Sequence, residues 1–235
     1  MKTIIEICKE AADLAAVRRP EDLFNSSSQQ DSIFLSLAKS TLDSLLRYGD
    51  WQNLVKDGWI YVQPHQRRYV IKELIPDYYS MVNNTIYIRD TREKVVGAVT
   101  AQQWMHDKYS SSQGCGLEFK IQNDCIVFAR LPSARYKLEF QYRSDNIVWD
   151  FHTYIEKNEL TANTDVPIFD EYLVKLGILW RWLKRSGLSY DEEYEEYSRE
   201  LKKKFGVEQA AGDINLAGGS GYEQGVTINA VKVNK

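Results

Sequence analysis

The sequence predicts an α+β protein, with a helical bundle formed by the N- and C-terminal helices, an antiparallel β-rich insert and an extended C-terminal arm. Apolar residues recur at helical spacing near both ends, whereas the middle of the chain shows the two-residue alternation of strands. The last segment loses this periodicity and is rich in glycine. We assign residues 1–50 together with 165–205 to the helical domain, 51–164 to the insert and 206–235 to the arm.

Two helices are predicted in the N-terminal region. Thr3 and Glu6 have the spacing of a capping box, and the apolar residues that follow predict a helix over 4–17. Residues 18–30 contain a proline and three consecutive serines, so we expect a loop there. Asp31 is a favourable N-cap for a second helix, and Gly49 stands where its C-cap glycine is expected.

The middle of the chain has the pattern of an antiparallel sheet. The clearest strand runs over 135–143, where apolar and polar residues alternate. Residues 117–128 predict a hairpin whose turn is Asn123-Asp124. Thr100 and Gln103 again have capping-box spacing, so a short helix over 100–109 interrupts the strands.

Two further helices are predicted after Asp165. Pro167 suits the first turn of the first one, because a missing N–H costs nothing there. Its apolar side chains cover more than one face, which indicates burial between neighbours in its own chain or in other chains. Gly177 in this helix would let another helix approach closely. A Ser186-Gly187 break precedes the second helix, which has acidic residues at its start, basic residues at its end and a tyrosine-lined stripe that ends at Phe205.

No residue pattern indicates catalysis, a metal or a cofactor. The three histidines are scattered, the three cysteines form no CxxC pair, and Gly218-Gly219-Ser220-Gly221 lacks the strand and helix of a phosphate loop. A net charge of -3 disfavours tight DNA binding. No apolar run approaches the roughly 20 residues that span a bilayer, and no signal peptide is visible. We expect a protein made in the cytoplasm that is not an enzyme and has no membrane partner.

This order of elements resembles the head-to-tail adaptor (connector) proteins of tailed bacteriophages, particularly the short-tailed type. Two stretches carry the resemblance: residues 45–51, LLRYGDW, and residues 161–190, which begin TANTDVP, continue LGILWRWLKR and end GLSY. The resemblance covers most of the chain in the order of elements, and its specific residues lie at 160–200.

The resemblance implies a structural virion protein at the head-tail junction. Such a protein forms a ring, typically of twelve copies, beneath the portal protein, joins it to the next tail component (a nozzle or tail-tube protein) and lines the passage of genomic DNA without sequence specificity. The helical part packs between neighbouring copies; our candidate subunit-packing residues are Leu176, Gly177, Trp180, Trp182 and Leu183. The arm docks on the portal; our candidates there are Tyr222, Val226, Ile228, Val231 and Val233.

Two other functions stay open. The tyrosines and tryptophans suit stacking platforms of a nucleic-acid-processing or carbohydrate-active enzyme. The insert also suits a ligand-binding module of a tail protein. An enzyme of this length is compatible with a monomer, whereas an adaptor must form a ring on its portal, so particle size separates the hypotheses.

Overall fold

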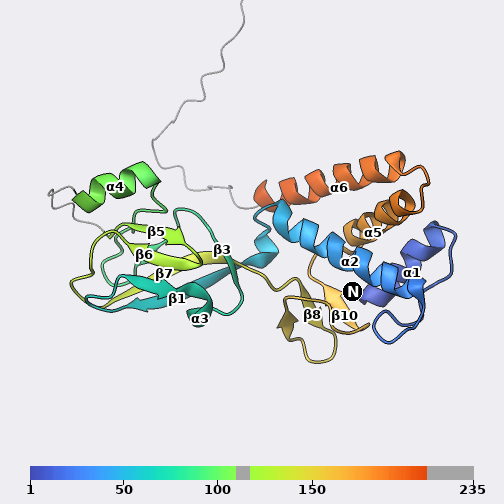
Figure 1. Ribbon diagram of the computed structural model, residues 1–235, viewed down its shortest axis with the longest axis horizontal. Coiled ribbons are helices and arrows are strands. Elements are labelled where there is room, and N and C mark those ends of the chain that lie inside the picture. Colours follow the sequence, from blue (N-terminus) through green and yellow to red (C-terminus); the bar gives the residue numbers. More distant parts are fainter. Residues whose placement is uncertain (110–116, 211–235) are drawn as a thin grey trace, which may run out of the picture.

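The computed structural model describes residues 1–109 and 117–210, and it confirms a mixed α+β protein with antiparallel sheets. The described residues form two lobes that lie side by side (Figure 1). We call residues 55–145 the β-lobe. We call residues 1–54 together with 147–210 the helical lobe, because their buried apolar residues form a core separate from that of the β-lobe.

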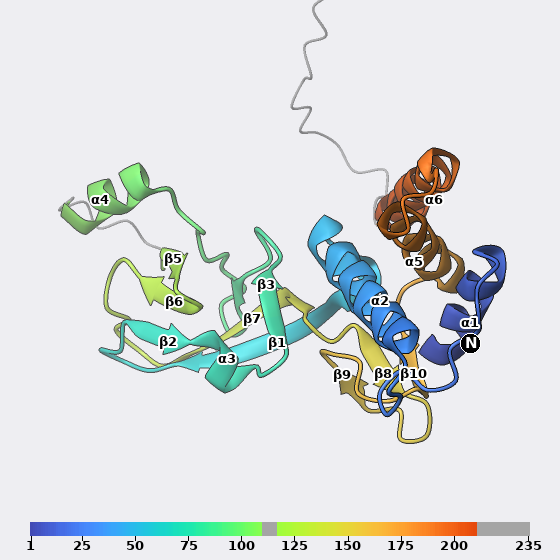
Figure 2. The ribbon, with the colours of Figure 1, turned by 45° about the vertical axis from the view of Figure 1, so that its right-hand side comes forward.

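Helix α5 is the centre of the helical lobe. It spans Glu171–Arg185 and packs against α1 (Ile4–Leu14), α2 (Gln29–Tyr48) and α6 (Asp191–Ala210). The capping box of α1 is present, with the Thr3 N–H donating to Glu6 Oε2 at 2.8 Å. Figure 2 shows α1, α2, α5 and α6 grouped at one end of the molecule. Burial of α5 between helices of its own chain explains why its apolar residues cover more than one face.

A small three-stranded sheet supports these helices. Its order is β10 (Asp165–Pro167), β8 (Val148–Asp150) and β9 (Glu156–Lys157). Its neighbours Ile147 and Leu160 are buried in the core of the helical lobe, as are Trp51 and Leu54 of the short 3₁₀ helix region at Gln52–Leu54. Residues from both ends of the segment 51–164 therefore share a core with the helices rather than with the β-lobe.

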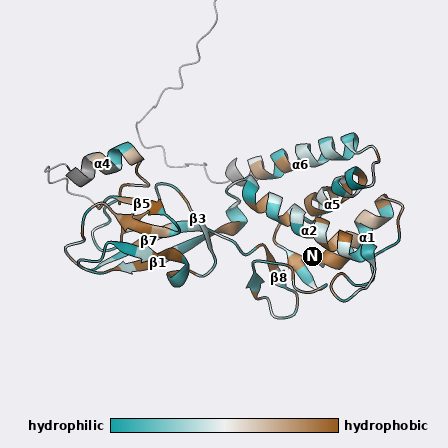
Figure 3. Ribbon diagram, in the orientation of Figure 1, coloured by the Kyte–Doolittle hydropathy of each residue, from teal (hydrophilic) through white to brown (hydrophobic). Residues whose placement is uncertain are grey.

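The β-lobe has two sheets around one core. In the first, β1 (Val55–Val62) pairs with β7 (Tyr136–Ser144), which also pairs with β3 (Tyr78–Met81) and β4 (Tyr87–Ile88). In the second, β6 (Cys125–Phe128) lies between β2 (Arg68–Val70) and β5 (Phe119–Gln122). Helices α3 (Ile71–Leu74) and α4 (Ala101–Tyr109) complete the lobe. Figure 3 shows hydrophobic residues on β5 and β7, in contrast to the largely hydrophilic α6.

The two clearest strand predictions are confirmed. In β7, Leu138, Phe140 and Tyr142 are buried, and Glu139 and Gln141 lie on the opposite face. Strands β5 and β6 form the predicted hairpin, and its turn residues Asn123 and Asp124 both have positive φ. Asn and Asp adopt that conformation more readily than most residues, which is why this pair signals a two-residue turn.

The structure corrects three element boundaries. Pro167 lies in β10 and not in a first helical turn; α5 begins at Glu171, where Asp170 is the N-cap and accepts hydrogen bonds from the N–H groups of Tyr172 and Leu173. Helix α2 begins at Gln29, two residues before the predicted start. Helix α1 ends at Leu14, because Ala16 adopts a positive φ.

Gly49 is the C-cap of α2, as predicted, but for a different reason. Its φ of 176° is extended backbone that any residue adopts. A Cβ at this position would lie 2.4 Å from the ring of Phe205, so the glycine permits close approach of α6. Helix α6 itself continues to Ala210, five residues into the segment 206–235 that we assigned to the arm.

Candidate interaction surfaces

The five candidate subunit-packing residues on α5 all pack within their own chain. Leu176 and Leu183 are buried in the lobe. A Cβ on Gly177 would lie 2.4 Å from Thr41 Cγ2, so this glycine lets α2 approach α5, as the sequence predicted for a neighbouring helix. The ring of Trp182 stacks on Phe34 at 4.5 Å. Their role between subunits therefore stays a prediction.

Trp180 marks the surface where α5 meets α6. Its ring contacts Tyr194 and Tyr197, with centroid distances of 5.2 and 6.1 Å. The Arg181 guanidinium lies 4.3 Å from the Trp180 ring centroid and donates to Gly177 O and Ser44 Oγ. The tyrosine-lined stripe of α6 thus packs on α5, with Tyr197 and Leu201 buried and Tyr194 largely exposed.

The candidate portal-binding residues Tyr222, Val226, Ile228, Val231 and Val233 lie outside the described residues. The assignment of an arm that docks on the portal stays a prediction. The last described residue before that segment is Ala210, at the C-terminal end of α6.

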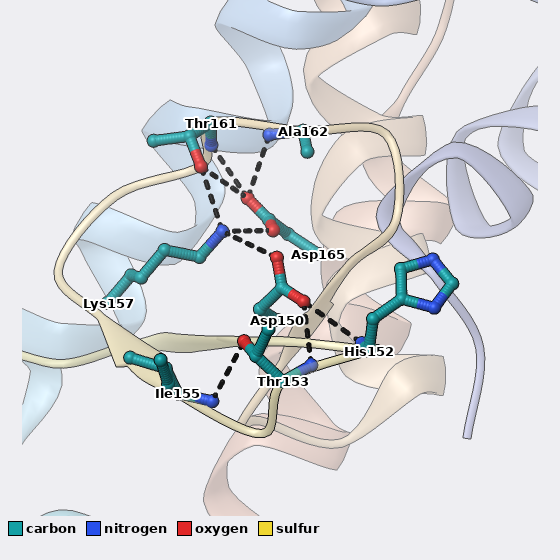
Figure 4. Close-up of polar contacts among 8 residues, drawn as sticks. All are labelled: Asp150, His152, Thr153, Ile155, Lys157, Thr161, Ala162 and Asp165. Carbon is teal, nitrogen blue, oxygen red and sulfur yellow. Dashed lines mark hydrogen bonds and ion pairs between the residues drawn. The ribbon is translucent and has the colours of Figure 1, made fainter.

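The segment that carries the resemblance to adaptors contains a fully buried carboxylate, Asp165 (Figure 4). Asp165 Oδ2 accepts the N–H groups of Thr161 and Ala162 at 2.7 and 2.9 Å, and Oδ1 accepts Lys157 Nζ at 2.5 Å. Lys157 also reaches Asp150, at 3.4 Å. A buried charge is tolerated when it is paired and hydrogen-bonded, so this network explains why an Asp occupies this position.

Asp150 ties the same network to the hairpin between β8 and β9. Its Oδ1 accepts the N–H groups of His152 and Thr153 at 2.9 and 3.0 Å. These backbone donors, Thr153 first, lower the pKa of Asp150 to about 2. The carboxylate is therefore ionised at neutral pH and holds the turn (Figure 4). The turn is closed further by Tyr154 N–H donating to Asp150 O at 2.8 Å.

This hairpin presents apolar side chains to the outside. We call residues 149–155 the hairpin tip. Tyr154 is 72% exposed, Ile155 62% and Phe151 42%. The ring of Trp149 stacks with Tyr154 at 5.2 Å and with Phe151 at 6.5 Å. These stacking contacts order the rings before any partner binds. The turn that carries them has no charged side chain between Asp150 and Glu156. Aromatic anchors of this kind are typical of protein–protein interfaces.

Sequence reasoning missed the hairpin tip. The usable signal was an uncharged run, Phe151 to Ile155, placed in a turn rather than in a strand. Turns are ordinarily polar, so apolar residues there indicate contact with something outside the chain. We read residues 51–164 as one β-rich region and did not separate this turn from it.

The two lobes are joined by charged groups at their junction. Asp77 of the β-lobe accepts hydrogen bonds from Lys56 Nζ, Tyr142 Oη and Ser144 Oγ, each at 2.9 Å. Lys56 also pairs with Glu156 of β9 in the helical lobe. Arg143 Nη1 donates to Gly49 O at 2.5 Å and pairs with Asp50 at 2.9 Å. Both contacts cross from one lobe to the other.

Within the described ranges, His, Cys, Asp and Glu side chains form no group of three that suits a metal ion. His65 and His152 are exposed, and burial raises the pKa of the Cys8 thiol to about 12. No described helix is both long and apolar enough to cross a bilayer. Comparison with family models and with curated proteins finds no match for this chain.

Proposed function

We propose that this protein is a head-to-tail adaptor of a tailed bacteriophage, which forms a ring beneath the portal, of twelve copies if it follows the family it resembles. In this proposal the helical bundle of α1, α2, α5 and α6 belongs to the ring, and the β-rich insert extends from that bundle. The protein acts by binding, and the genome passes through the ring without sequence-specific contacts.

The observation that carries the proposal is the hairpin tip. Three apolar side chains with exposed fractions between 42% and 72% stand on a turn fixed by Asp150. Ordered aromatic side chains lose little conformational entropy on binding, which is why they are frequent interface anchors. Single exposed apolar residues are common on protein surfaces, but apolar side chains clustered on one turn indicate an interaction site. We therefore assign the tip to the next tail component.

The residues that carry the resemblance to adaptors have consistent physical roles. Asp165 holds the loop at 161–165 through two backbone N–H groups, and Gly177 admits α2 against α5. Gly187 has a φ of 71°, a conformation that favours glycine, at the break between α5 and α6. The resembling segment is therefore a structural unit, which supports membership of a family that shares this framework.

The candidate arm supplies the contact with the portal. Residues 211–235 follow Ala210, and 25 extended residues reach at most about 80–90 Å. A β-branched sequence such as Val226-Thr227-Ile228 suits strand addition to a sheet edge, where main-chain hydrogen bonds supply the affinity.

Electron microscopy of the protein mixed with its portal tests the proposal. We expect a ring seated on the portal. A second mixture adds the next tail component and compares the parent with a Tyr154→Ala/Ile155→Ala variant. We expect that variant to form the ring but to lose the tail component. The control is Leu14→Ala, an exposed apolar residue far from the tip in sequence. A protein that never associates with the portal contradicts the adaptor assignment.

A further inference from the structure

The solvent-facing side of the sheet in the β-lobe carries aromatic rings where polar residues are usual. We call this the outer face. Register places Trp59 opposite Glu139 and Tyr61 opposite Lys137, with Tyr87 on the other side of Glu139. Trp59, Tyr61 and Tyr87 are 54%, 42% and 44% exposed. One side of an antiparallel sheet is normally solvated and polar, so three neighbouring rings indicate a covered surface.

The rings of the outer face are held in place by cations. Lys137 Nζ lies 4.8 Å from the centroid of Trp59, and the Arg135 guanidinium lies 4.3 Å from that of Tyr61. Trp59 and Tyr61 make an edge contact at 5.3 Å. Binding therefore requires little reordering of these side chains.

Charge divides the outer face into two ends. A hollow of about 440 Å³ is lined by Tyr61, Arg89, Asp90, Arg135 and Lys137, which makes that end cationic. The neighbouring hollow of about 630 Å³ contains Asp57 and Glu139, and because Glu139 already pairs with Arg89 and Lys137, Asp57 makes that end acidic. Asp57 at the acidic end and Tyr61 at the cationic end are four residues apart on β1, so the rise of a strand separates the two ends by about 14 Å.

Helix α6 has the complementary pattern on its exposed side. Glu192, Glu195, Arg199 and Lys202 are exposed and follow one another at spacings of three, four and three residues, so they share one face. Within the described ranges, none of the four forms an ion pair with another residue. The acidic pair and the basic pair are seven residues apart, about 10 Å along the helix. That separation is about 4 Å shorter than the one between the two ends of the outer face, a difference that long side chains such as arginine and lysine can span.

These two surfaces belong to different lobes, and the N-terminal end of α6 is the end farther from the β-lobe (Figure 1). The acidic pair therefore cannot reach the cationic hollow of its own chain. We propose that the outer face of one copy binds the exposed stripe of α6 in a second copy, with Glu192 and Glu195 at the cationic hollow and Arg199 and Lys202 at the acidic one. Such a contact joins two different surfaces, and repetition of a head-to-tail contact forms a ring when the rotation between copies closes. The inference deepens the proposed ring and rests on it.

Compensating charge reversals test the contact. The first variant is Arg135→Glu, chosen because Arg89 and Lys137 already pair with Glu139. The second is Glu192→Arg/Glu195→Arg, and the third combines all three changes in one chain. Arg68→Glu, an exposed position on the other sheet, is the control. Self-association is measured by sedimentation velocity over a series of protein concentrations, with and without the portal. The series extends far enough to detect dissociation constants up to about 1 mM.

We expect each of the first two variants to weaken self-association at least tenfold, and the combined variant to return within about threefold of the parent. The control should match the parent. A combined variant no stronger than the weaker single one overturns the contact, as does a parent that does not self-associate in either condition. Loss of single-stranded DNA binding in Arg135→Glu, with self-association unchanged, would assign the outer face to nucleic acid instead. Rescue without any portal binding would keep the contact and contradict the adaptor role.

Discussion

The two lobes differ in how the chain builds their cores. The core of the β-lobe is made from one continuous stretch, from Ile60 to Tyr142. The core of the helical lobe combines residues before and after that stretch, such as Ile4 and Phe34 with Leu173 and Leu201. The β-lobe therefore forms within one internal segment, although β1 and β7 pair across most of its length, whereas the helical lobe forms only when both ends of the chain meet. We expect the lobes to respond separately to mutation.

The largest expected effect is in the β-lobe. Phe128 is fully buried, and Phe128→Ala should lower the free energy of unfolding of this lobe by about 3–5 kcal/mol. Hydrogen exchange should then accelerate in β2, β5 and β6 and stay unchanged in α1, α2 and α5. The control is Ile121→Ala in the same hairpin, where the side chain is 37% exposed. Equal acceleration in both lobes would show a single cooperative unit.

Leu176→Ala is the matching change in the helical lobe. Leu176 lies on α5 and is buried against the neighbouring helices, so the substitution should lower the free energy of unfolding by about 2–5 kcal/mol. Trp180→Ala should cost less, because its ring is only partly buried. Thermal unfolding followed by circular dichroism measures both, against Leu188→Ala at an exposed site. A melting temperature of Leu176→Ala equal to that of the parent would contradict the assignment of this residue to the core.

Gly177→Ala tests the close contact between α2 and α5. A Cβ 2.4 Å from Thr41 Cγ2 forces the helices apart, which should cost about 1–3 kcal/mol despite the better helix propensity of alanine. Gly206→Ala on α6 is the matched control, because nothing lies within 4 Å of its added Cβ. Denaturant unfolding should show a loss for the first variant and no loss for the second. The reverse order would refute the packing argument.

The junction between the lobes should depend on pH. Burial disfavours the charge of Asp77, but hydrogen bonds from Lys56, Ser144 and Tyr142 outweigh it and hold its pKa below the ordinary value. A depressed folded-state pKa gives stability that is fully present above the ordinary value of about 4 and is lost as pH falls through the folded value. Asp77→Asn should reduce this loss in acid-unfolding curves. Acid-unfolding curves of the same slope for the parent and the variant would show that Asp77 does not contribute to the pH dependence of stability.

The smallest expected effect comes from removing residues 211–235. These follow α6 and lie outside the described residues, and their sequence has few large apolar groups to offset the entropy cost of ordering them. The truncated protein should melt within about 1 °C of the parent and lose attachment to the portal in co-sedimentation. A lower melting temperature would mean that the segment packs on one of the lobes, and undiminished co-sedimentation would move the portal contact elsewhere.

Local signals predicted the elements well where one residue decides the geometry. Asn123-Asp124 defined a turn, and the alternation in β7 defined its buried face. The prediction was wrong at Pro167, because a proline fits an edge strand as well as a first helical turn. The sequence did not reveal that Ile147 and Leu160 share a core with helices, since periodicity describes a face but not its partner.

The sites were harder to predict than the elements. Gly177 was recognised as a close-approach position, but its partner, Thr41 on α2, is 136 positions away in the chain. The hairpin tip depends on Asp150, Lys157 and Asp165 meeting in space, and no spacing rule announces that network. The outer face depends on the register of β1 with β7, which is set by long-range pairing.

The chain enters and leaves the β-lobe at neighbouring points, which affects how this lobe can change during evolution. Val55 and Arg143 are register partners, so the first residue of β1 and the end of β7 lie only about 5 Å apart. A domain whose two ends are neighbours is a natural cassette, because recombination that replaces it leaves the surrounding framework in place. Evolution is therefore free to exchange this cassette for others with different surfaces, while the helical framework that carries Asp165 and Gly177 stays the same.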